Sequence, residues 1–539
     1  MTAHRPAVAR NSTIYIAASL LQKMSAAILL PVYTRLLTPD EYGYFSMLVT
    51  TTLLMSTIAT LGLDYGVMRY CHLGDDERAN PQAQQRRRVA LSAVVTVLSV
   101  VGVTLTVLLL VTGPLYGPVV FPGLGFFPAV ALAVVAVTFQ PMTLVYLSFL
   151  QTSERPARFV ACSVGYFLLN ASFTVAFVGP VEMGVAGTSL ALLCANAVTA
   201  LLCVVDALRT GALWARFRLS DAREILAYSL PMVPHAVSLQ TTAFATRLVI
   251  LRILDAAAVG LFNIAMYVVS VIDAVQTAMH RAFMPFYFTE AKRGALGWRS
   301  RMHDVIAGFV AANVLLAAAA AVFSPEALAI LTPKSFHGAA EIVPILALSM
   351  MVKSLYYPSL TELLFQDRGT RAAMAVSTSA SAVSIVAAIP LTLVWGLTGI
   401  AVAQVVQRLM MSGLACRLAV RANGAGIPWG RVLRLQVVGA TSVVFALFIF
   451  PASSTVLGEV WTVVLKALFL AGLFVVVLAA EPSVVRMLRK KVNHGSQSAP
   501  EAIASSSTHR EEGQGLQGIL RGRDVHESSS ARRRPGPRA

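Results

Sequence analysis

Long apolar segments recur along nearly the whole chain, and each is long enough to cross a membrane as an α-helix. A run of about 20 apolar residues spans the ~30 Å hydrocarbon core of a bilayer. The composition agrees, because 56% of the residues are hydrophobic and only 13% are charged, whereas soluble domains contain about a quarter charged residues. A transmembrane β-barrel would show alternating segments of about 10 residues instead. The sequence therefore predicts an all-α, polytopic membrane protein.

We expect fourteen transmembrane helices. Their approximate cores are residues 13–34, 44–67, 89–112, 126–150, 159–178, 184–205, 225–251, 259–280, 303–323, 341–364, 373–394, 397–416, 432–451 and 461–480. The eleventh and twelfth are the least clearly divided, because only Trp395 and Gly396 separate them. The first segment is too long for the core of a signal peptide and no small-residue cleavage site follows it, so we expect it to be retained.

Three short segments recur in the same order at nearly one displacement. The displacements are 217, 213 and 212 residues, and the pairs are 35–43 with 252–260, 154–158 with 367–371, and 184–187 with 396–399. Such agreement indicates an internal duplication. Duplicated helical bundles in a bilayer are typical of transporters whose site lies between the two halves.

The duplication predicts two six-helix bundles, residues 1–205 and 225–420. Because each bundle has an even number of crossings, both begin on the same side of the membrane and the repeats are parallel. We further expect a cytoplasmic linker at 206–224, a C-terminal hairpin of transmembrane helices 13 and 14 within 421–492, and a disordered cytoplasmic tail at 493–539. The Ser-, Gly- and Arg-rich composition of the tail cannot bury a core.

The net charge of +17 does not indicate nucleic-acid binding, because the basic residues occupy alternate loops. They cluster before the first span, in the loops after spans 2, 6, 8 and 12, and after the last span, whereas the opposite loops hold only Arg35, Arg252 and Lys334. By the positive-inside rule, both termini are cytoplasmic and the protein resides in the cytoplasmic membrane.

The sequence shows no sign of an enzyme that uses a metal or a cofactor. The five cysteines are odd in number, scattered and without metal-ligand spacing, so we expect neither a disulfide framework nor a zinc site. A phosphate-binding loop of the Gly-x-x-x-x-Gly-Lys-Ser/Thr type is absent, so we expect no ATP hydrolysis and no catalytic residues.

The segment Arg35-Leu-Leu-Thr-Pro-Asp-Glu-Tyr-Gly43, with Asn11-Ser-Thr-Ile and Pro31-Val-Tyr-Thr before it and Gly62-Leu-Asp-Tyr-Gly-Val-Met-Arg-Tyr70 after it, resembles the signature of Wzx-type polysaccharide or O-antigen repeat-unit flippases. These belong to the multidrug/oligosaccharidyl-lipid/polysaccharide exporter superfamily, which also contains lipid II flippases and drug extruders. The resemblance covers spans 1–12, and fourteen spans fit the flippase branch better than the usual twelve of the drug extruders.

The resemblance implies a flippase that moves a polyprenyl-diphosphate-linked oligosaccharide across the membrane by alternating access, for lipopolysaccharide or exopolysaccharide biosynthesis. It also implies cooperation with a polysaccharide polymerase and a chain-length regulator, and H⁺ or Na⁺ as a coupling ion. The anionic head of such a cargo needs cations inside the bilayer, while its apolar tail stays in the membrane lipid.

Buried cations are the candidates for binding that head, since a charge at the bilayer centre costs at least ~2.5–3.5 kcal/mol and needs a reason. Lys23 lies in the middle of span 1, on one face with Ser19. Span 7 is the repeat partner of span 1. His235 lies on a polar face of this span, and Arg247 lies beside that face, near the outer edge of the membrane. Either cation can instead be structural, paired with an acid or reaching the interface.

Two further cations lie centrally in the second bundle. Lys353 in span 10 is flanked by Tyr356 and Tyr357, and Arg408 in span 12 is flanked by Gln404 and Gln407. Lys353, Arg408 and Gln404 therefore join Lys23, Ser19, Arg247 and His235 as predicted substrate-binding residues.

The buried acids are Asp273 in span 8 and Glu362 near the inner end of span 10. Asp273 lies on a broad polar face and is a candidate for binding a coupling proton or Na⁺ in exchange for cargo, and Glu362 is the second candidate. Asp273 is equally suited to pair with a buried cation in a purely structural role.

Two other functions remain open. One is an ion-coupled multidrug or metabolite exporter of the same fold, for which we would expect a smaller, more acidic or aromatic cavity. The other is a polyprenyl-dependent membrane glycosyltransferase or polymerase, for which Asp40 and Glu41 supply outer acidic residues, although the large outer loop common in such enzymes is missing.

Overall fold

The computed structural model describes residues 28–73, 80–213, 219–294, 296–366, 369–421, 426–450 and 460–482. These ranges contain helices and turns but no strand, and they belong to one compact unit up to Glu481. Within them, twelve helices are long and apolar enough to cross a membrane. The predicted all-α, multi-pass architecture is confirmed, whereas the count of fourteen stays a prediction because most of the first span lies outside the described residues.

The first half begins with the helical residues 28–36, the end of the first predicted span. Its elements are α2 (Pro39–Thr60), α3 (Leu63–Tyr70), α4 (Pro81–Val120), the π-helix η1 (Phe126–Val130), α5 (Ala131–Ala136), α6 (Gln140–Thr152), α7 (Pro156–Val178) and α8 (Gly184–Arg209). The predicted span 44–67 is too long, because Leu61 and Gly62 adopt left-handed backbone angles and end α2.

The second half contains most of the remaining elements. They are α9 (Leu219–Ser229), η2 (Leu230–Met232), α10 (Val233–Ile253), α11 (Ala256–Arg293), α12 (Trp298–Val322), α13 (Ser324–Leu331), η3 (Lys334–Glu341), α14 (Val343–Lys353), α15 (Tyr356–Leu364) and α16 (Gly369–Val420). The predicted span 225–251 is interrupted at η2, where Pro231 lies. The predicted span 341–364 is divided between α14 and α15.

The long helix α16 contains a chain reversal at the predicted division between spans 11 and 12. Gly396 has φ 57° and ψ −132°, which is not helical. A Cβ built on Gly399 would collide with the carbonyl oxygen of Leu391, although residues eight apart in a straight helix lie about 12 Å apart. The two arms of α16 therefore correspond to two predicted crossings, 373–394 and 397–416.

The first repeated segment has the same local structure in both halves. Thr38 caps α2 by accepting a hydrogen bond from the Glu41 backbone N–H, and the Glu41 carboxylate accepts one in return from the Thr38 N–H at 2.9 Å. Asp255, the residue 217 positions later, caps α11 by accepting from the Ala258 N–H at 2.7 Å. These side chains satisfy N–H groups that the first helical turn leaves unpaired.

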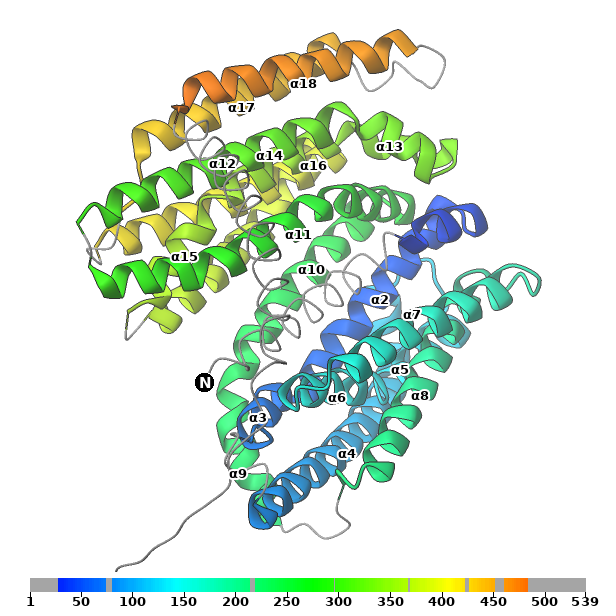
Figure 1. The fold of residues 1–539 in the computed structure, drawn as a ribbon. Coiled ribbons are helices and arrows are strands. Elements are labelled where there is room, and N and C mark those ends of the chain that lie inside the picture. Colours follow the sequence, from blue (N-terminus) through cyan, green and yellow to red (C-terminus); the bar gives the residue numbers. More distant parts are fainter. Residues whose placement is uncertain are drawn as a thin grey trace, which may run out of the picture. The chain divides into compact units, whose positions relative to one another are not determined.

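The two repeats meet where α2 packs against α11 (Figure 1). A Cβ on Gly43 would collide with the carbonyl oxygen of Ala256, and a Cβ on Gly260 would lie 2.6 Å from that of Pro39. Pro39 and Ala256 are repeat partners, as are Gly43 and Gly260. The contact is thus reciprocal, as expected at a twofold-related interface.

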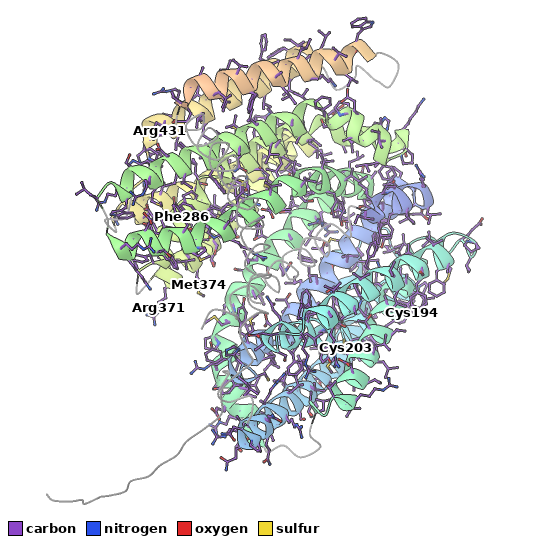
Figure 2. All side chains as sticks on the ribbon, in the orientation of Figure 1. Cys194, Cys203, Phe286, Arg371, Met374 and Arg431 are labelled. Carbon is purple, nitrogen blue, oxygen red and sulfur yellow. The ribbon has the colours of Figure 1, made fainter. Side chains whose placement is uncertain are left out.

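Two further helices, α17 (Trp429–Ile449) and α18 (Val460–Ala480), pack against each other and against α12 (Figure 1). Ion pairs attach them to the second half. Arg431, labelled in Figure 2, donates to Asp304 at 2.9 Å and to Glu481 at 2.8 Å. Lys466, only 1% exposed, pairs with Glu326 at 2.6 Å. Because removing one member of a buried pair leaves an uncompensated charge, these pairs fix the position of the hairpin.

We expect Gly43→Ala to destabilise the protein by about 1–3 kcal/mol or more, because the added methyl group forces the α2 and α11 backbones apart. The measurement is thermal unfolding of the purified protein in detergent. Gly413→Ala is the matched control, since nothing lies within 4 Å of a Cβ at that helical position. Equal melting temperatures for the two variants would contradict the proposed close crossing.

Candidate functional site

The predicted site residues fall into three groups. Lys23 and Ser19 lie outside the described residues, as does the side chain of His235, whose backbone is in the first turn of α10. Arg247 lies beside the crossing of α2 and α11. Asp273, Lys353, Arg408 and Gln404 belong to helices of the second half, and Glu362 lies near the end of α15.

Arg247 bridges the two repeats. Its Nε donates to the Ser46 hydroxyl at 3.1 Å and its Nη2 donates to the Asn263 side-chain oxygen at 2.7 Å. Ser46 belongs to α2 and Asn263 to α11, and they are repeat partners 217 residues apart. Asn263 donates in turn to the Tyr42 hydroxyl at 3.2 Å. Arg247 thus acts as a clamp at the repeat interface, through neutral hydrogen-bond acceptors.

Lys353 and Asp273 form an ion pair between α14 and α11. Tyr357 lies against both groups. Its ring centroid is 5.3 Å from the lysine Nζ, and its hydroxyl donates to the Asp273 carboxylate at 3.4 Å. The Lys353 side chain is 12% exposed and that of Asp273 is 30% exposed, so the carboxylate is the less covered partner. This conformation agrees with the structural role considered for Asp273, in which its carboxylate pairs with a buried cation.

Arg408 on α16 is a second cation beside this pair. Its charge acts on Asp273 and on the Tyr356 and Tyr357 hydroxyls. Its Nε is buried, and among the described residues it has no hydrogen-bond partner. Gln404, one turn earlier on α16, is 7% exposed. Asp273 thus pairs with Lys353 and lies within the electrostatic influence of Arg408, and the Arg408 Nε–H is placed to donate to a further oxygen ligand.

The repeat-interface clamp and this cationic cluster are separate. Both involve α11, at Asn263 and at Asp273, and ten helical residues correspond to about 15 Å along the axis. The structure therefore brings three of the predicted residues together, namely Asp273, Lys353 and Arg408, and places Arg247 elsewhere. Glu362 is also apart. It is 2% exposed and accepts a hydrogen bond from the Gly426 N–H at 3.0 Å, holding the chain after α16.

Several polar residues of these clusters were not predicted from the sequence. Ser46 carries no signal by itself, but its position one repeat before Asn263 would have identified it. His280 and Thr361 extend the cationic cluster toward the end of α11. The hydroxyl of Thr361 lies 3.4 Å from His280 Nδ1, and the His280 and Tyr357 rings are 4.8 Å apart. Their contacts join residues about 80 positions apart, which no local pattern reveals.

The fold is that of membrane transporters. A solved structure described as "Lipid II flippase MurJ, inward closed conformation" superposes with a TM-score of 0.65 at 11% identity, covering 87% of this chain and 97% of that one. An inward-facing multidrug resistance MATE family transporter of the MOP superfamily superposes with a TM-score of 0.59 at 13% identity, covering 77% and 96%. At these identities the likeness establishes the fold alone.

The sequence itself defines the family. A family model described as "Polysaccharide biosynthesis protein" matches residues 8–290, more than half of the chain, and the protein belongs to this family. No curated protein sequence matches the chain. Family and fold together confirm the superfamily predicted from the motif at residues 35–43 and support a multi-pass membrane flippase or exporter.

We expect Arg247→Gln to loosen the interface between the repeats, because hydrogen bonds to a charged group are each worth about 1.5–3 kcal/mol. The variant should lower the melting temperature, whereas Arg252→Gln, at an exposed position of the same helix, should not. The double variant Arg247→Gln/Asn263→Ala should lose less stability than the sum of the single variants. Strict additivity would show that the bond between Arg247 and Asn263 contributes nothing to stability.

Proposed function

We propose that the protein is a flippase that translocates a polyprenyl-diphosphate-linked oligosaccharide across the cytoplasmic membrane, with both termini on the cytoplasmic side. The two repeats would alternate in opening to either side. The observation that carries the proposal is the family match combined with the surplus of cations at the Asp273–Lys353–Arg408 cluster. Lys23, which lies outside the described residues, would add to this positive charge if it lies on the same path.

The chemistry of the cluster suits a diphosphate. A diphosphate carries several anionic oxygens, and Lys and Arg replace its hydration shell with charge-assisted hydrogen bonds. The Arg408 Nε–H has no hydrogen-bond partner among the described residues, and the Tyr356 and Tyr357 hydroxyls and the Gln404 amide are suited to bonding with phosphate or sugar oxygens. We propose that Lys353 exchanges its bond to Asp273 for one to the cargo.

Asp273 is the proposed ion-coupling residue. When a proton or Na⁺ neutralises this carboxylate, the Asp273–Lys353 ion pair weakens and Lys353 can bind the anionic cargo more tightly. In this conformation, cation binding at Asp273 and anion binding at Lys353 would therefore support each other, which corresponds to cotransport of cation and cargo and replaces the exchange expected from the sequence. Glu362 is the weaker candidate, since it is buried and bonded to the Gly426 backbone.

A multidrug or metabolite exporter is the second candidate, and the likeness to MATE structures favours it. Dye efflux distinguishes it, because a drug exporter lowers cellular dye accumulation whereas a flippase specific for lipid-linked sugar does not.

A polymerase or glycosyltransferase is less favoured, since Glu41, one of its two outer acids, is engaged in capping α2. The proposed flippase would instead supply its cargo to a separate polymerase and chain-length regulator.

We expect Lys353→Gln to reduce export of surface polysaccharide at least tenfold, because the cargo loses a charge-assisted bond. The decisive variant is Lys353→Gln/Asp273→Asn, which removes both charges and keeps hydrogen-bonding groups. If Lys353 binds cargo, the double variant stays inactive. If the pair is only structural, the double variant regains export, and this result would contradict the proposed role.

The assay measures surface polysaccharide in cells, with membrane levels of each variant determined by immunoblot. Lys334→Gln, at the exposed first residue of η3, is the matched control and should export normally. For ion coupling, Asp273→Asn should make flipping in vesicles indifferent to imposed pH and Na⁺ gradients. Equal gradient dependence in the wild type and this variant would exclude Asp273 as the coupling site.

A further inference from the structure

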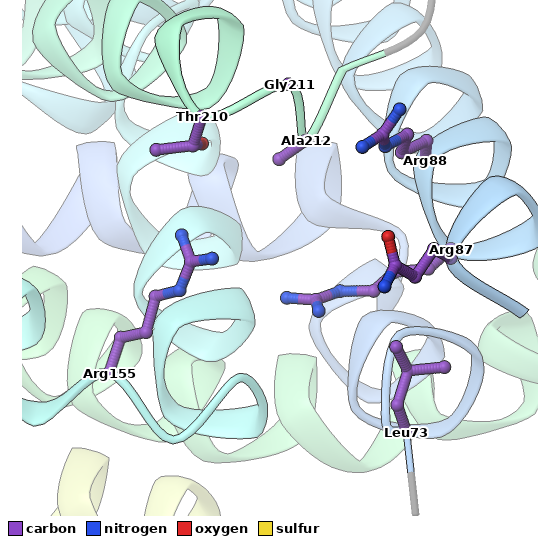
Figure 3. A pocket seen from close by; sticks show the side chains of 8 residues that line it. Leu73, Arg87, Arg88, Arg155, Thr210, Gly211 and Ala212 are labelled. Carbon is purple, nitrogen blue, oxygen red and sulfur yellow. The ribbon is translucent and has the colours of Figure 1, made fainter. Parts of the chain in front are cut away.

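A pocket in the first half is lined by three arginines that the proposed transport path does not use. It has a volume of about 190 Å³, and its lining residues are Leu73, Gln84, Arg87, Arg88, Arg155, Thr210, Gly211 and Ala212. The lining comes from the start of α4, the turn before α7 and the end of α8. Figure 3 shows the guanidinium groups of Arg87 and Arg155 extending toward each other from opposite sides of the pocket.

The charges of this pocket are not balanced by its described lining. The three arginines contribute positive charge, and no Asp or Glu belongs to the lining among the residues that the structure describes. Arg155 Nη1 is buried, and within the same residues it has no hydrogen-bond partner. A buried, unpaired guanidinium N–H beside other cations is costly. An anion between the guanidinium groups would remove that cost.

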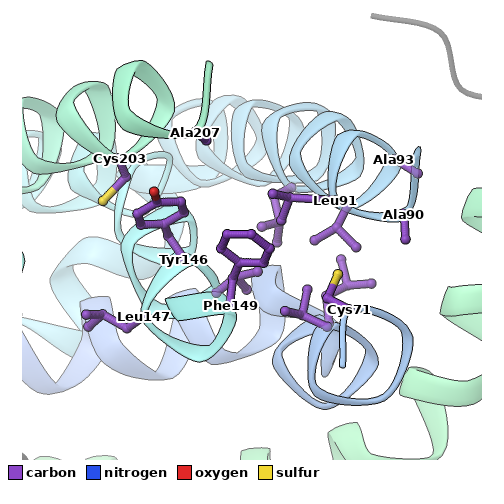
Figure 4. Packing of buried hydrophobic residues seen from close by; sticks show 14 of the residues in the cluster. Cys71, Ala90, Leu91, Ala93, Tyr146, Leu147, Phe149, Cys203 and Ala207 are labelled. Atoms are coloured by element: carbon purple, nitrogen blue, oxygen red, sulfur yellow. The ribbon is translucent and has the colours of Figure 1, made fainter. Parts of the chain in front are cut away.

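One of the three arginines, Arg87, is held in place before any ligand binds. Arg87 stacks on the Phe149 ring, with 4.7 Å from the guanidinium carbon to the ring centroid, and its Nη2 donates to the Ser153 hydroxyl. Phe149 is fully buried in a hydrophobic core that includes Leu91, Tyr146 and Cys71 (Figure 4). The buried Phe149 ring thus fixes the guanidinium donors of Arg87, so this side chain loses little conformational entropy when a ligand binds.

The pocket lies at the membrane surface. Arg87 and Arg88 immediately precede the apolar part of α4, which begins at Val89, and the positive-inside rule assigns this end to the cytoplasmic side. A second pocket of about 190 Å³ shares Leu73, Arg87 and Arg155 with the first and extends it toward Ser153. The combined space therefore adjoins the headgroup layer and has room for more than one phosphate.

We infer that this arginine pocket binds the phosphorylated headgroup of a membrane lipid. Guanidinium forks match the geometry of phosphate oxygens and bind them in pairs. The position at the lipid surface favours a lipid-borne phosphate over a soluble one. The inference does not require the proposed cargo to be correct. An anionic phospholipid presents the same phosphate oxygens to the arginines as a polyprenyl diphosphate does.

The test uses the purified full-length protein in nanodiscs and measures lipid retention by native mass spectrometry. Three probes distinguish the source of the phosphate, namely phosphatidylglycerol, undecaprenyl diphosphate and inorganic diphosphate. We expect at least one of the two lipids to bind, with inorganic diphosphate at least tenfold weaker. Arg155→Gln should weaken lipid binding about tenfold or more, and Arg88→Gln should weaken it as well.

Arg209→Gln is the matched control, since it removes the same charge from an exposed position at the end of α8 outside the lining. It should change binding less than twofold. Unchanged binding in both Arg155→Gln and Arg88→Gln, each with a wild-type elution profile, would overturn the inference. Preferential binding of inorganic diphosphate would overturn it too.

One acidic segment of the chain is an alternative to lipid phosphate as the anion in the arginine pocket. Residues 74–79 include Asp75, Asp76 and Glu77 and lie outside the described residues. If these carboxylates supply the anion, the wild type will retain no lipid phosphate, whereas the variant Asp75→Asn/Asp76→Asn/Glu77→Gln will retain it. That pair of results would overturn the inference for the native protein. Retention by the wild type that depends on Arg155 supports it.

Discussion

The arrangement of the whole protein depends on how closely α2 and α11 approach each other at Gly43 and Gly260. Between helices in a bilayer the hydrophobic effect supplies no attraction, because lipid tails are as apolar as leucine, and close backbone packing has to supply it instead. Each glycine contacts the backbone of the opposite repeat, at Ala256 and Pro39. The two capped helix starts, at Thr38 and Asp255, place these glycines one turn inside the membrane-spanning helices.

This crossing determines where polar groups can meet. Ser46 and Asn263 follow the two glycines by three residues, so they lie on the same helix faces and Arg247 reaches both. Farther along α11, Asp273 faces Lys353 and Tyr357 within the second half. The Asp273–Lys353–Arg408 cluster therefore belongs to one bundle, and the Arg247 clamp, whose acceptors are neutral, belongs to the interface. A transporter built this way can separate the holding of its repeats from the binding of its cargo.

The all-α class and the repeated segments at 35–43 and 252–260 are predictable from the sequence, because apolar runs and recurring motifs are local patterns. The reversal at Gly396 was predicted from a two-residue gap between apolar segments. The Lys353–Asp273 pair stayed open between two roles, since side chains 80 residues apart give no local signal. The arginine pocket was not predicted from the sequence, because Arg87, Arg155 and Thr210 come from three segments far apart in the chain. Breaks at Leu61 and Pro231 were missed because apolar composition continues through them.

Alternating access is tested by labelling the cationic cluster from each side of the membrane in turn. A cysteine introduced at Thr277, one turn from Asp273 and 3.3 Å from the Tyr357 hydroxyl, would be labelled in a background without the five native cysteines. We expect an impermeant maleimide to label this cysteine from one face of the membrane at a time, with the accessible face changing when lipid-linked oligosaccharide is supplied. Protection from both faces under every condition would contradict alternating access.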